Sequence, residues 1–223
     1  KDAIGDEKYQ LFNTSDLGDI VGVSGTVFKT KVGELSIKVD EFLLLTKSLR
    51  PLPEKFHGVQ DQETIYRQRY LDLITNEDSF DRFKFRSKFI RSIREFYWKN
   101  DFTEIETPIL WNSASWAAAA PFSTHHNDFW EEFVLRIAPE TGLKKATVWR
   151  FERVFEMGKN FRNEGSDPSH MQEFSVFEHY AAYWNFEDNM KFTEDMFDHV
   201  FDDMKLDKNI KINSLSEENE INS

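Results

Sequence analysis

Apolar and polar residues alternate between positions 18 and 47, in the pattern of half-buried β-strands. The alternation runs through residues 20–28 and again through residues 35–42, and the turn Val32-Gly33 lies between the two runs. Two alternating runs joined by a short glycine-containing turn predict an antiparallel hairpin. We therefore expect residues 1–47 to belong to a small β-rich domain.

Two prolines mark the segment that follows. Residues 48–58 read SLRPLPEKFHG, with Pro51 and Pro53 two positions apart. Because proline has no backbone N–H to donate and restricts the residue before it, this segment is predicted to be neither a helix nor a central strand. We expect a linker over residues 48–75 and a second domain over residues 76–223.

Apolar residues at helical spacing come next. Residues 61–74 are predicted to form a helix, and so are residues 78–99, in which the recurring apolar positions are Phe83, Ile90, Ile93 and Phe96. The second of these helices should pack on a sheet that follows it. Residues 103–105 suit a short strand, whereas residues 111–120 mix Trp, Asn, Ser and four successive alanines and match no pattern.

The final third of the chain predicts a long hairpin followed by a helix. Residues 143–148 begin a short helix, and residues 154–163 and 173–183 read as antiparallel strands around a turn-rich loop at 165–169. Asn185 is placed to cap a helix whose apolar stripe consists of Phe186, Met190, Phe197, Phe201 and Met204. The last dozen residues are polar and are expected to fray. The whole pattern predicts an α+β fold.

Composition narrows the classes of protein that fit this pattern. The 223 residues carry a formal net charge of -12, which argues against a general basic surface for nucleic acid. There is no cysteine, so neither a disulfide framework nor a thiolate metal site is expected. No apolar run approaches the roughly twenty residues that cross a bilayer. We expect a soluble, cytoplasmic protein without membrane association.

The predicted hairpin carries the clearest candidate chemistry. Successive side chains of a strand alternate between faces, so Arg162 and Glu164 share a face of the first strand. On the second strand, the residues that share a face are Phe174, Val176, Glu178 and Tyr180. A guanidinium, carboxylates, an aromatic ring and a phenol on one surface suit an anionic group, a flat heterocycle and an amine. The same residues also fit a cross-strand ladder of salt bridges on an exposed sheet.

Several sequence words resemble the class II aminoacyl-tRNA synthetases. FTEIETPIL at residues 102–110 is similar to motif 1 of that class, and FRNEG followed by HMQEF is similar to motif 2. Within the subclass for lysine, aspartate and asparagine, THHN at 124–127, RIAPE at 136–140 and FERVFEMGKNFRNEG at 151–165 resemble the lysine enzyme. So do SLRPLPEKFHG and RQRYLDLI. THHN and RIAPE disfavour the aspartate and asparagine enzymes.

This resemblance implies a partial OB-type β-barrel that binds the anticodon over residues 1–47, and the first part of an antiparallel-sheet catalytic domain over residues 76–223. It implies activation of lysine with ATP, followed by transfer of lysine to the terminal ribose of tRNA(Lys). Mg²⁺ is the expected metal, although no ligand for it is expected in this segment. The class also implies a homodimer formed through motif 1.

By the same resemblance, the residues assigned to ATP are Arg162, Glu164, His170 and Phe174. Arg162 matches the catalytic arginine that binds the α-phosphate and the lysine carboxylate, and Phe174 matches the ring that stacks on adenine. Three further residues are assigned to lysine. Glu140 matches the carboxylate that receives the α-amino group, Tyr180 matches the phenol near the ε-amine, and Glu178 matches an acidic neighbour.

The chain departs from the family at positions of the family's ligand pocket. Trp116 stands where the family has a glycine, Ala120 where it has a basic residue, Gly142 where it has an aromatic residue, and Trp149-Arg150 where it has two glycines. Adding bulk to a fitted site costs about 1–3 kcal/mol, or excludes the ligand. The pattern indicates a remodelled pocket, produced either by engineering or by natural divergence.

The glycine-rich motif 3 of the class is not found, because no glycine follows Gly165. The glutamate that the family uses for the ε-amine, which comes later in the chain, is not found either. Two hypotheses follow from these departures: a lysine–tRNA ligase, and a catalytically silent ligand-binding protein on a remodelled synthetase scaffold. We expect the chain as it stands not to charge tRNA at a useful rate.

Overall fold

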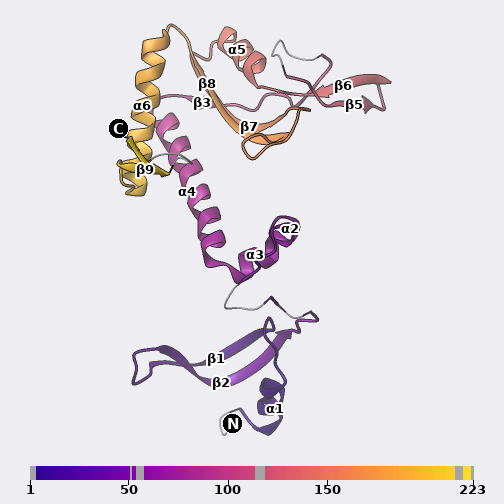
Figure 1. Ribbon diagram of the computed structural model, residues 1–223, viewed down its shortest axis with the longest axis vertical. Helices are drawn as coiled ribbons and strands as arrows, with labels where there is room; N and C mark the ends of the chain where they lie inside the picture. The colour runs from indigo at the N-terminus through magenta and orange to yellow at the C-terminus, as the bar shows by residue number, and fades with distance from the viewer. Residues whose placement is uncertain (1–3, 51, 54–57, 114–118, 214–217, 222–223) are drawn as a thin grey trace. The chain divides into compact units, whose positions relative to one another are not determined.

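The computed structural model describes residues 4–50, 52–53, 58–113, 119–213 and 218–221, and Figure 1 traces its helices and strands. The chain divides into two compact units, Lys1–Lys84 and Phe85–Ser223. Helices alternate along the chain with mainly antiparallel strands, which confirms the predicted α+β class. In the described part of the chain, no helix is both long and apolar enough to span a membrane.

The first unit contains the predicted hairpin. Strands β1 (Ile20–Lys29) and β2 (Leu35–Thr46) pair antiparallel, and the N–H of Gly33 closes the turn between them with a 2.9 Å hydrogen bond. At a bulge in this pair the backbones approach closely, so that a Cβ on Gly25 would lie 2.0 Å from the Lys38 carbonyl oxygen. Among the described residues of this unit, β1 and β2 form a two-stranded sheet and not a closed barrel.

Helix α1 (Asp6–Asn13) packs against β2. The ring of Phe12 meets the ring of Phe42 edge-on, with 5.6 Å between ring centres, and Phe42 is buried. Sequence analysis did not predict this helix, because it has no buried residue of its own and its polar residues dominate the pattern. Its position depends on the contact with Phe42.

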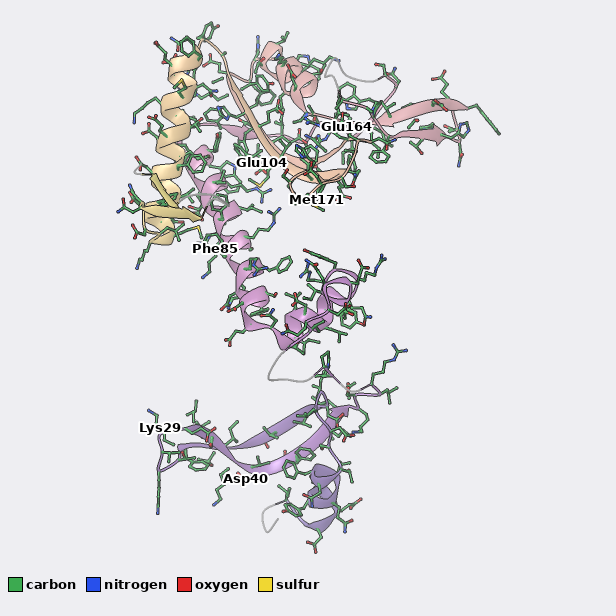
Figure 2. All side chains as sticks on the ribbon, viewed as in Figure 1. Lys29, Asp40, Phe85, Glu104, Glu164 and Met171 are labelled. Carbon is green, nitrogen blue, oxygen red and sulfur yellow. The ribbon has the colours of Figure 1, made fainter. Side chains whose placement is uncertain are left out.

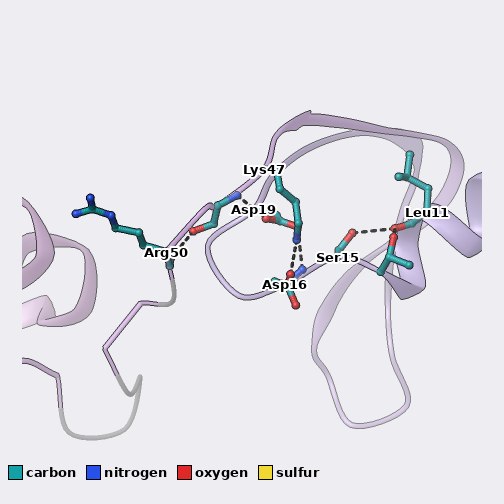
Figure 3. A network of polar contacts seen from close by, with 8 residues as sticks. Leu11, Ser15, Asp16, Asp19, Lys47 and Arg50 are labelled. Carbon is teal, nitrogen blue, oxygen red and sulfur yellow. Dashed lines mark hydrogen bonds and ion pairs between the residues drawn. The ribbon is translucent and has the colours of Figure 1, made fainter.

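Figure 3 shows a polar network that joins the segment after α1 to the end of β2. The ammonium of Lys47 contacts the carboxylates of Asp16 and Asp19, and the Asp19 carboxylate also accepts the backbone N–H of Ser48 at 2.7 Å. The hydrogen bond from Lys47, followed by those from backbone N–H groups, lowers the pKa of Asp19 from its usual 3.8 to about 2. Charge therefore reinforces the closure of this hairpin.

Residues 61–74 fold as two helices where one was predicted. Helix α2 (Gln62–Arg67) begins at Asp61, whose carboxylate accepts a backbone N–H at 2.8 Å, and α3 (Arg69–Thr75) follows directly. Gln68, between them, has φ −124° and ψ 54°, which lies outside the helical region. Apolar residues keep their helical spacing through this break, so the sequence pattern did not reveal it.

The second unit is built around the predicted long hairpin. Strands β7 (Arg153–Phe161) and β8 (Glu173–Ala181) pair antiparallel, and β3 (Thr103–Glu104) joins β7 in parallel. These strands confirm the predictions for residues 103–105, 154–163 and 173–183. A second sheet, in the order β4-β6-β5, was not predicted; its strands are β4 (Leu110–Trp111), β5 (Ser123–His126) and β6 (Glu131–Leu135).

Helices cover both faces of the β7–β8 hairpin (Figure 1). Helix α4 (Glu77–Lys99), which confirms the prediction for residues 78–99, packs on one face together with α6 (Phe186–Met204). Helix α5 (Glu140–Val148) packs on the other face, where Leu143 meets Val154. The core on the first face is largely aromatic; its buried members are Ile93, Phe96, Tyr97, Phe102, Phe155, Phe192, Met196 and Val200.

The buried stripe of α6 differs from the predicted stripe. The core-facing residues of this helix, each at most 8% exposed, are Phe192, Met196 and Val200. Three members of the predicted stripe are 45–73% exposed, namely Phe186, Met190 and Phe197. Both stripes have helical spacing, and the aromatic core decides between them, because the Phe192 ring lies 4.9 Å from the Phe96 ring.

The two ends of α6 gave one correct and one wrong prediction. Asn185 caps the helix as predicted, and its side-chain oxygen accepts the N–H groups of Glu187 at 2.7 Å and Asp188 at 3.0 Å. The prediction of a frayed end after α6 is wrong, because β9 (Ile210–Asn213) and β10 (Glu218–Ile221) pair antiparallel. Backbone hydrogen bonds, which need no apolar pattern, form this hairpin.

Candidate active site

The candidate site lies on the face of β7–β8 that α5 covers in part. Glu178 is opposite Glu156 in the register of these strands, and opposed residues of an antiparallel pair share a face. The β8 residues on this face are those predicted to share it: Phe174, Val176, Glu178 and Tyr180. The backbone N–H of Arg162 donates to the carbonyl of Gln172 at 2.8 Å, which continues the pairing toward the loop. Figure 2 labels Glu164 and Met171 in that loop.

Arg162 and Phe174 meet at the loop end of this face. The guanidinium carbon of Arg162 lies 5.2 Å from the centre of the Phe174 ring, and the arginine is exposed while the ring is half-buried. A guanidinium above a ring keeps N–H groups that point outward in the guanidinium's own plane, where they can bind an anion. The alternative interpretation, a ladder of salt bridges, is not favoured on this face. In the described residues, the ion pair across the hairpin joins Lys159 and Glu173 on the opposite face, at 3.1 Å.

Tyr180, Glu178 and Glu140 gather toward the other end of the same face. The Tyr180 hydroxyl donates to Glu178 Oε1 at 2.7 Å. Burial first, and then the neighbouring carboxylate of Glu178, raises the pKa of the Tyr180 phenol well above its usual 10. The phenol therefore stays protonated at neutral pH and acts as a hydrogen-bond donor to Glu178.

The side-chain ammonium of a lysine in this chain already contacts this group of side chains. The ammonium of Lys144 lies 2.6 Å from Glu140 Oε1 and 5.6 Å from the centre of the Tyr180 ring. Glu140 starts α5 and Lys144 follows one helical turn later, so the two side chains are neighbours on the helix surface. A carboxylate and an aromatic face at this spacing are suited to binding an ammonium group.

A buried ionic network supports the site from within. Arg136 and Glu156 form an ion pair whose side chains are at most 4% exposed. Arg136 also donates to the Thr107 hydroxyl at 2.9 Å and, through Nε, to the Lys159 carbonyl at 3.0 Å. Glu156 accepts the Thr107 hydroxyl at 2.7 Å. These bonds compensate for taking both charges out of water and connect β6, β7 and the segment after β3.

Sequence analysis did not identify this network, although one signal for it was present. Glu156 is an even number of positions before Arg162, so strand alternation would have placed it on the same face. Arg136 carries no such signal, because its position in RIAPE does not indicate a buried partner. Its contact with Thr107, 29 positions earlier in the chain, depends on the fold.

The loop after β7 contains the remaining nucleotide candidates. Glu164 Oε1 accepts the backbone N–H of Ala120 at 3.3 Å, and the N–H of Asn163 donates to the Ala120 carbonyl at 2.8 Å. Nδ1 of His170 lies 2.6 Å from a carboxylate oxygen of Asp167. Arg162, Glu164, His170 and Phe174 thus belong to one loop and the two strand ends that flank it. The functional roles assigned to these residues stay predictions.

The departures from the family do not all lie in one pocket. Trp149 is 69% exposed at the end of α5, and Arg150 after it is exposed with φ 86°. Gly142, in the first turn of α5, packs so tightly that a Cβ there would lie 2.6 Å from the Cβ of Thr107. Ala120 touches the loop through its backbone, as described above. Trp116 lies outside the described residues.

A cavity of about 350 Å³ lies beside this site. Its lining includes Trp111, Pro121, Ile137, Thr141 and Lys145, and the Lys145 ammonium lies 5.3 Å from the centre of the Trp111 ring. Among the described tryptophans, Trp111 lines this cavity, whereas Trp130 is 82% exposed in the turn after β5. Exposure of Trp130 and Trp149 argues against a pocket filled by these indoles.

Comparison with known proteins identifies the family. The family described as tRNA synthetases class II (D, K and N) matches residues 61–222. The chain is 53% identical over 207 residues to a lysine–tRNA ligase of Streptococcus agalactiae serotype V, an alignment that covers 93% of this chain and 42% of that protein. It is 54% identical over 202 residues to a lysine–tRNA ligase of Variovorax paradoxus, covering 91% and 39%, and 53% identical over 200 residues to one of Bacillus cereus, covering 90% and 40%.

The chain therefore spans about two fifths of the length of the curated relatives it matches. The family match covers the segments that resemble motifs 1 and 2 and every residue of the candidate site. With more than half of its residues inside that match, this chain belongs to the class II tRNA synthetases of the D, K and N group.

Proposed function

We propose that this chain is part of a lysine–tRNA ligase, which activates lysine with ATP and transfers it to tRNA(Lys). The observation that carries the proposal is the face of the β7–β8 hairpin, where an anion-binding arginine over an aromatic ring and an amine-binding group occur on one surface. Identity of 53–54% to lysine–tRNA ligases over at least 90% of the chain supports the choice of amino acid.

At the loop end of this face, Arg162 is proposed to bind the α-phosphate of ATP and the carboxylate of lysine. The lysine carboxylate oxygen attacks the α-phosphorus, the bond to the bridging oxygen breaks, and pyrophosphate leaves. Reaction of two anions is slowed by their repulsion, and a fixed guanidinium offsets the charge that builds up in the transition state. Phe174 would support the adenine ring, and Glu164 and His170 would complete the contacts with the nucleotide.

At the α5 end, Glu140 is proposed to receive the α-amino group of lysine, and Tyr180 with Glu178 the ε-ammonium. The pairing of Lys144 with Glu140, beside the Tyr180 ring, supports this assignment, because a primary ammonium is the group expected in the substrate. In the second step, a hydroxyl of the terminal tRNA ribose attacks the carbonyl carbon of lysyl-adenylate. The bond between this carbon and the phosphate oxygen breaks, and AMP leaves.

Family membership extends the proposal beyond this site. Residues 1–47 are proposed to belong to an OB-type barrel that binds the anticodon, motif 1 to a homodimer interface, and the reaction to the cytoplasm. Mg²⁺ would supply further neutralisation of the triphosphate. Among the described residues, no group of three or more His, Asp or Glu side chains is placed to hold a metal ion, so we assign no ligand to it and no step through it.

Calorimetric titration of the chain with ATP, with lysine and with a lysyl-adenylate analogue tests the proposal. We expect the analogue to bind and Arg162→Ala to weaken its binding by about tenfold or more, since charge-assisted hydrogen bonds are worth about 1.5–3 kcal/mol. Arg91→Ala is the control, because Arg91 is an exposed arginine of α4 that pairs with Glu95. Equal affinity in Arg162→Ala and in the unmodified chain would remove Arg162 from the site.

Amino-acid-dependent pyrophosphate exchange separates the candidate functions. Exchange with lysine above that with aspartate and asparagine supports the ligase. Preference for aspartate or asparagine would contradict the choice of amino acid. Binding of the analogue without exchange by the chain or by the protein of full family length would favour the catalytically silent alternative.

A further inference from the structure

The loop between β7 and β8 contains an acidic residue, Asp167, that sequence analysis did not assign to the site. Its oxygen Oδ1 accepts three hydrogen bonds: from the backbone N–H of Ser169 at 2.7 Å, from the Ser169 hydroxyl at 2.8 Å, and from the backbone N–H of His170 at 2.9 Å. Its other oxygen, Oδ2, lies 2.6 Å from Nδ1 of the His170 ring. One carboxylate therefore holds both the turn and the ring.

These contacts decide which nitrogen of the neutral His170 ring carries the proton. Hydrogen bonds from Ser169, followed by that from His170, lower the pKa of Asp167 to about 2, so at neutral pH its carboxylate is ionised and only accepts hydrogen bonds. The Ser169 oxygen, 3.1 Å from Nδ1, already donates its proton to Asp167 and can likewise only accept. Both neighbours of Nδ1 are acceptors, so Nδ1 carries a proton and the lone pair of the neutral ring is on Nε2.

We propose that Asp167 is a positioning residue for nucleotide binding, which acts by fixing the tautomer and the orientation of His170. The proposal rests on the proposed function, in which His170 contacts the nucleotide. When the ring is protonated, Nε2–H donates to a phosphate oxygen. When it is neutral, the lone pair of Nε2 faces that oxygen and the hydrogen bond is lost. Asp167 thereby decides whether the neutral ring meets that oxygen with a proton or with a lone pair.

The other charged groups near the loop are engaged elsewhere. Arg162 lies over the Phe174 ring, Glu164 accepts the N–H of Ala120, and Glu173 pairs with Lys159. In the described part of the chain, no hydrogen bond or ion pair joins the His170 ring to Arg162, Glu164 or Glu173. His170 itself is exposed. In the part of the chain that the structure describes, control of the ring by a charged group therefore falls to Asp167.

Replacement of Asp167 by asparagine separates the turn from the ring. In Asp167→Asn, the amide oxygen still accepts the hydrogen bonds of the turn. The NH₂ group takes the place of Oδ2 and is a donor, so it can bond to the His170 ring only when Nδ1 carries the lone pair. Two-dimensional ¹H–¹⁵N NMR of the ring nitrogens distinguishes the tautomers, and His170→Gln identifies the His170 signals among those of the six histidines. At about pH 8.5, where most imidazoles are neutral, we expect Nδ1–H in the unmodified chain and Nε2–H in Asp167→Asn. The same tautomer in both would overturn the proposal.

ATP titrations at one acidic and one alkaline pH test the consequence for binding, the two values being chosen from the NMR spectra so that the His170 ring is protonated at the first and neutral at the second. The neutral ring of Asp167→Asn can still donate a hydrogen bond from Nε2 to the phosphate. We therefore expect the affinity of Asp167→Asn for ATP to fall about tenfold less between the two pH values than the affinity of the unmodified chain. A factor of about ten corresponds to the low end of the range for one charge-assisted hydrogen bond. Titration of ATP itself is common to both proteins and cancels.

Asp195→Asn is the matched control, since Asp195 is a half-buried residue of α6 that pairs with Lys191 at 2.7 Å and its replacement changes the net charge equally. This control should match the unmodified chain. Identical pH dependence in all three proteins would overturn the positioning role while leaving the proposed function intact. Absence of ATP binding at every pH, with intact thermal unfolding, would overturn both.

Discussion

The two faces of the β7–β8 hairpin are stabilised by different interactions. On one face, Tyr97 packs against Phe155 and Phe177, with ring centres 5.0 and 4.5 Å away, in a core that α4 and α6 enclose. On the other face, the buried ion pair of Arg136 and Glu156 lies under the candidate site. Apolar packing is non-directional, whereas a buried charge requires a partner at every polar atom. The face with the candidate chemistry is therefore expected to tolerate substitution less well than the apolar face.

The largest effect is expected from breaking the buried ion pair on the polar face. Glu156→Ala should reduce the free energy of unfolding by about 3–5 kcal/mol, because it leaves the Arg136 guanidinium buried without its carboxylate. Urea denaturation followed by tryptophan fluorescence measures the loss. Glu173→Ala is the control, since Glu173 forms an exposed pair with Lys159 and should cost less than about 1 kcal/mol. Equal losses in the two variants would contradict the role given to the buried pair.

A somewhat smaller effect is expected from a cavity in the aromatic face. Phe192→Ala should cost about 3 kcal/mol, at the low end of the range for phenylalanine truncation, since Phe192 keeps 8% of its surface exposed. Phe186→Ala on the same helix should change stability by less than about 0.5 kcal/mol, because this residue is 73% exposed. The same denaturation experiment compares them. If Phe186→Ala is the more damaging of the two, the buried stripe of α6 has been assigned to the wrong side.

A gain in stability is expected at the end of α5, the helix that covers the polar face. Arg150 has φ 86°, a left-handed conformation that costs a non-glycine residue about 1–2 kcal/mol. Arg150→Gly should therefore raise the free energy of unfolding by about 1 kcal/mol. Trp149→Gly is the control, because Trp149 has φ −87° and gains nothing from glycine. Thermal unfolding of the two variants measures the difference, and a lower midpoint for Arg150→Gly would contradict the strain.

The smallest effect is expected from the polar residues inside the aromatic face. His179 lies between Tyr97 and Asn189, with Nδ1 2.8 Å from the Tyr97 hydroxyl and Nε2 2.5 Å from Asn189 Oδ1. Burial lowers the pKa of His179 below its usual 6.5, and the hydrogen bond with Asn189 only partly opposes this. His179 binds a proton less readily in the folded chain than in the unfolded chain. The contribution of His179 to the free energy of unfolding is therefore present in full above pH 6.5 and is lost as the pH falls below that value.

Denaturation at a series of pH values measures this fall, and His179→Gln should flatten it. Asp19 and Asp167 also stabilise the fold as anions, but their pKa values of about 2, against the usual 3.8, make their contributions disappear only below about pH 4. The interval between about pH 6.5 and about pH 4 therefore isolates His179. An unchanged slope in His179→Gln would show that other groups cause the fall.

Strand alternation was sufficient to predict which residues of the hairpin share a face. The predicted set Phe174, Val176, Glu178 and Tyr180 lies on one side of β8, and Arg162 reaches the Phe174 ring. The Asn185 cap was also predictable, because a cap depends on a few neighbouring residues. Both features arise from interactions between residues close in sequence or from a fixed repeat of the backbone.

The supporting groups of the site were not predictable in this way. Arg136, Thr107 and Glu156 come from three separate segments, and Lys144 reaches the Tyr180 ring from a helix 36 positions earlier in the chain. The exposure of Trp149 and the close packing at Gly142 were not predictable either, since both depend on neighbours that no local pattern specifies.

The amino-acid sequence by itself determined the hairpins β1–β2 and β7–β8, the helices α4 and α6, the Asn185 cap and the side of β8 on which the candidate chemistry lies, because periodicity and capping act over a few residues. The tertiary structure alone decided which of the two apolar stripes of α6 is buried, where the helix at residues 61–74 breaks, and which partner neutralises Arg136. Each of these depends on free energies of packing and desolvation that are set by residues distant in the sequence.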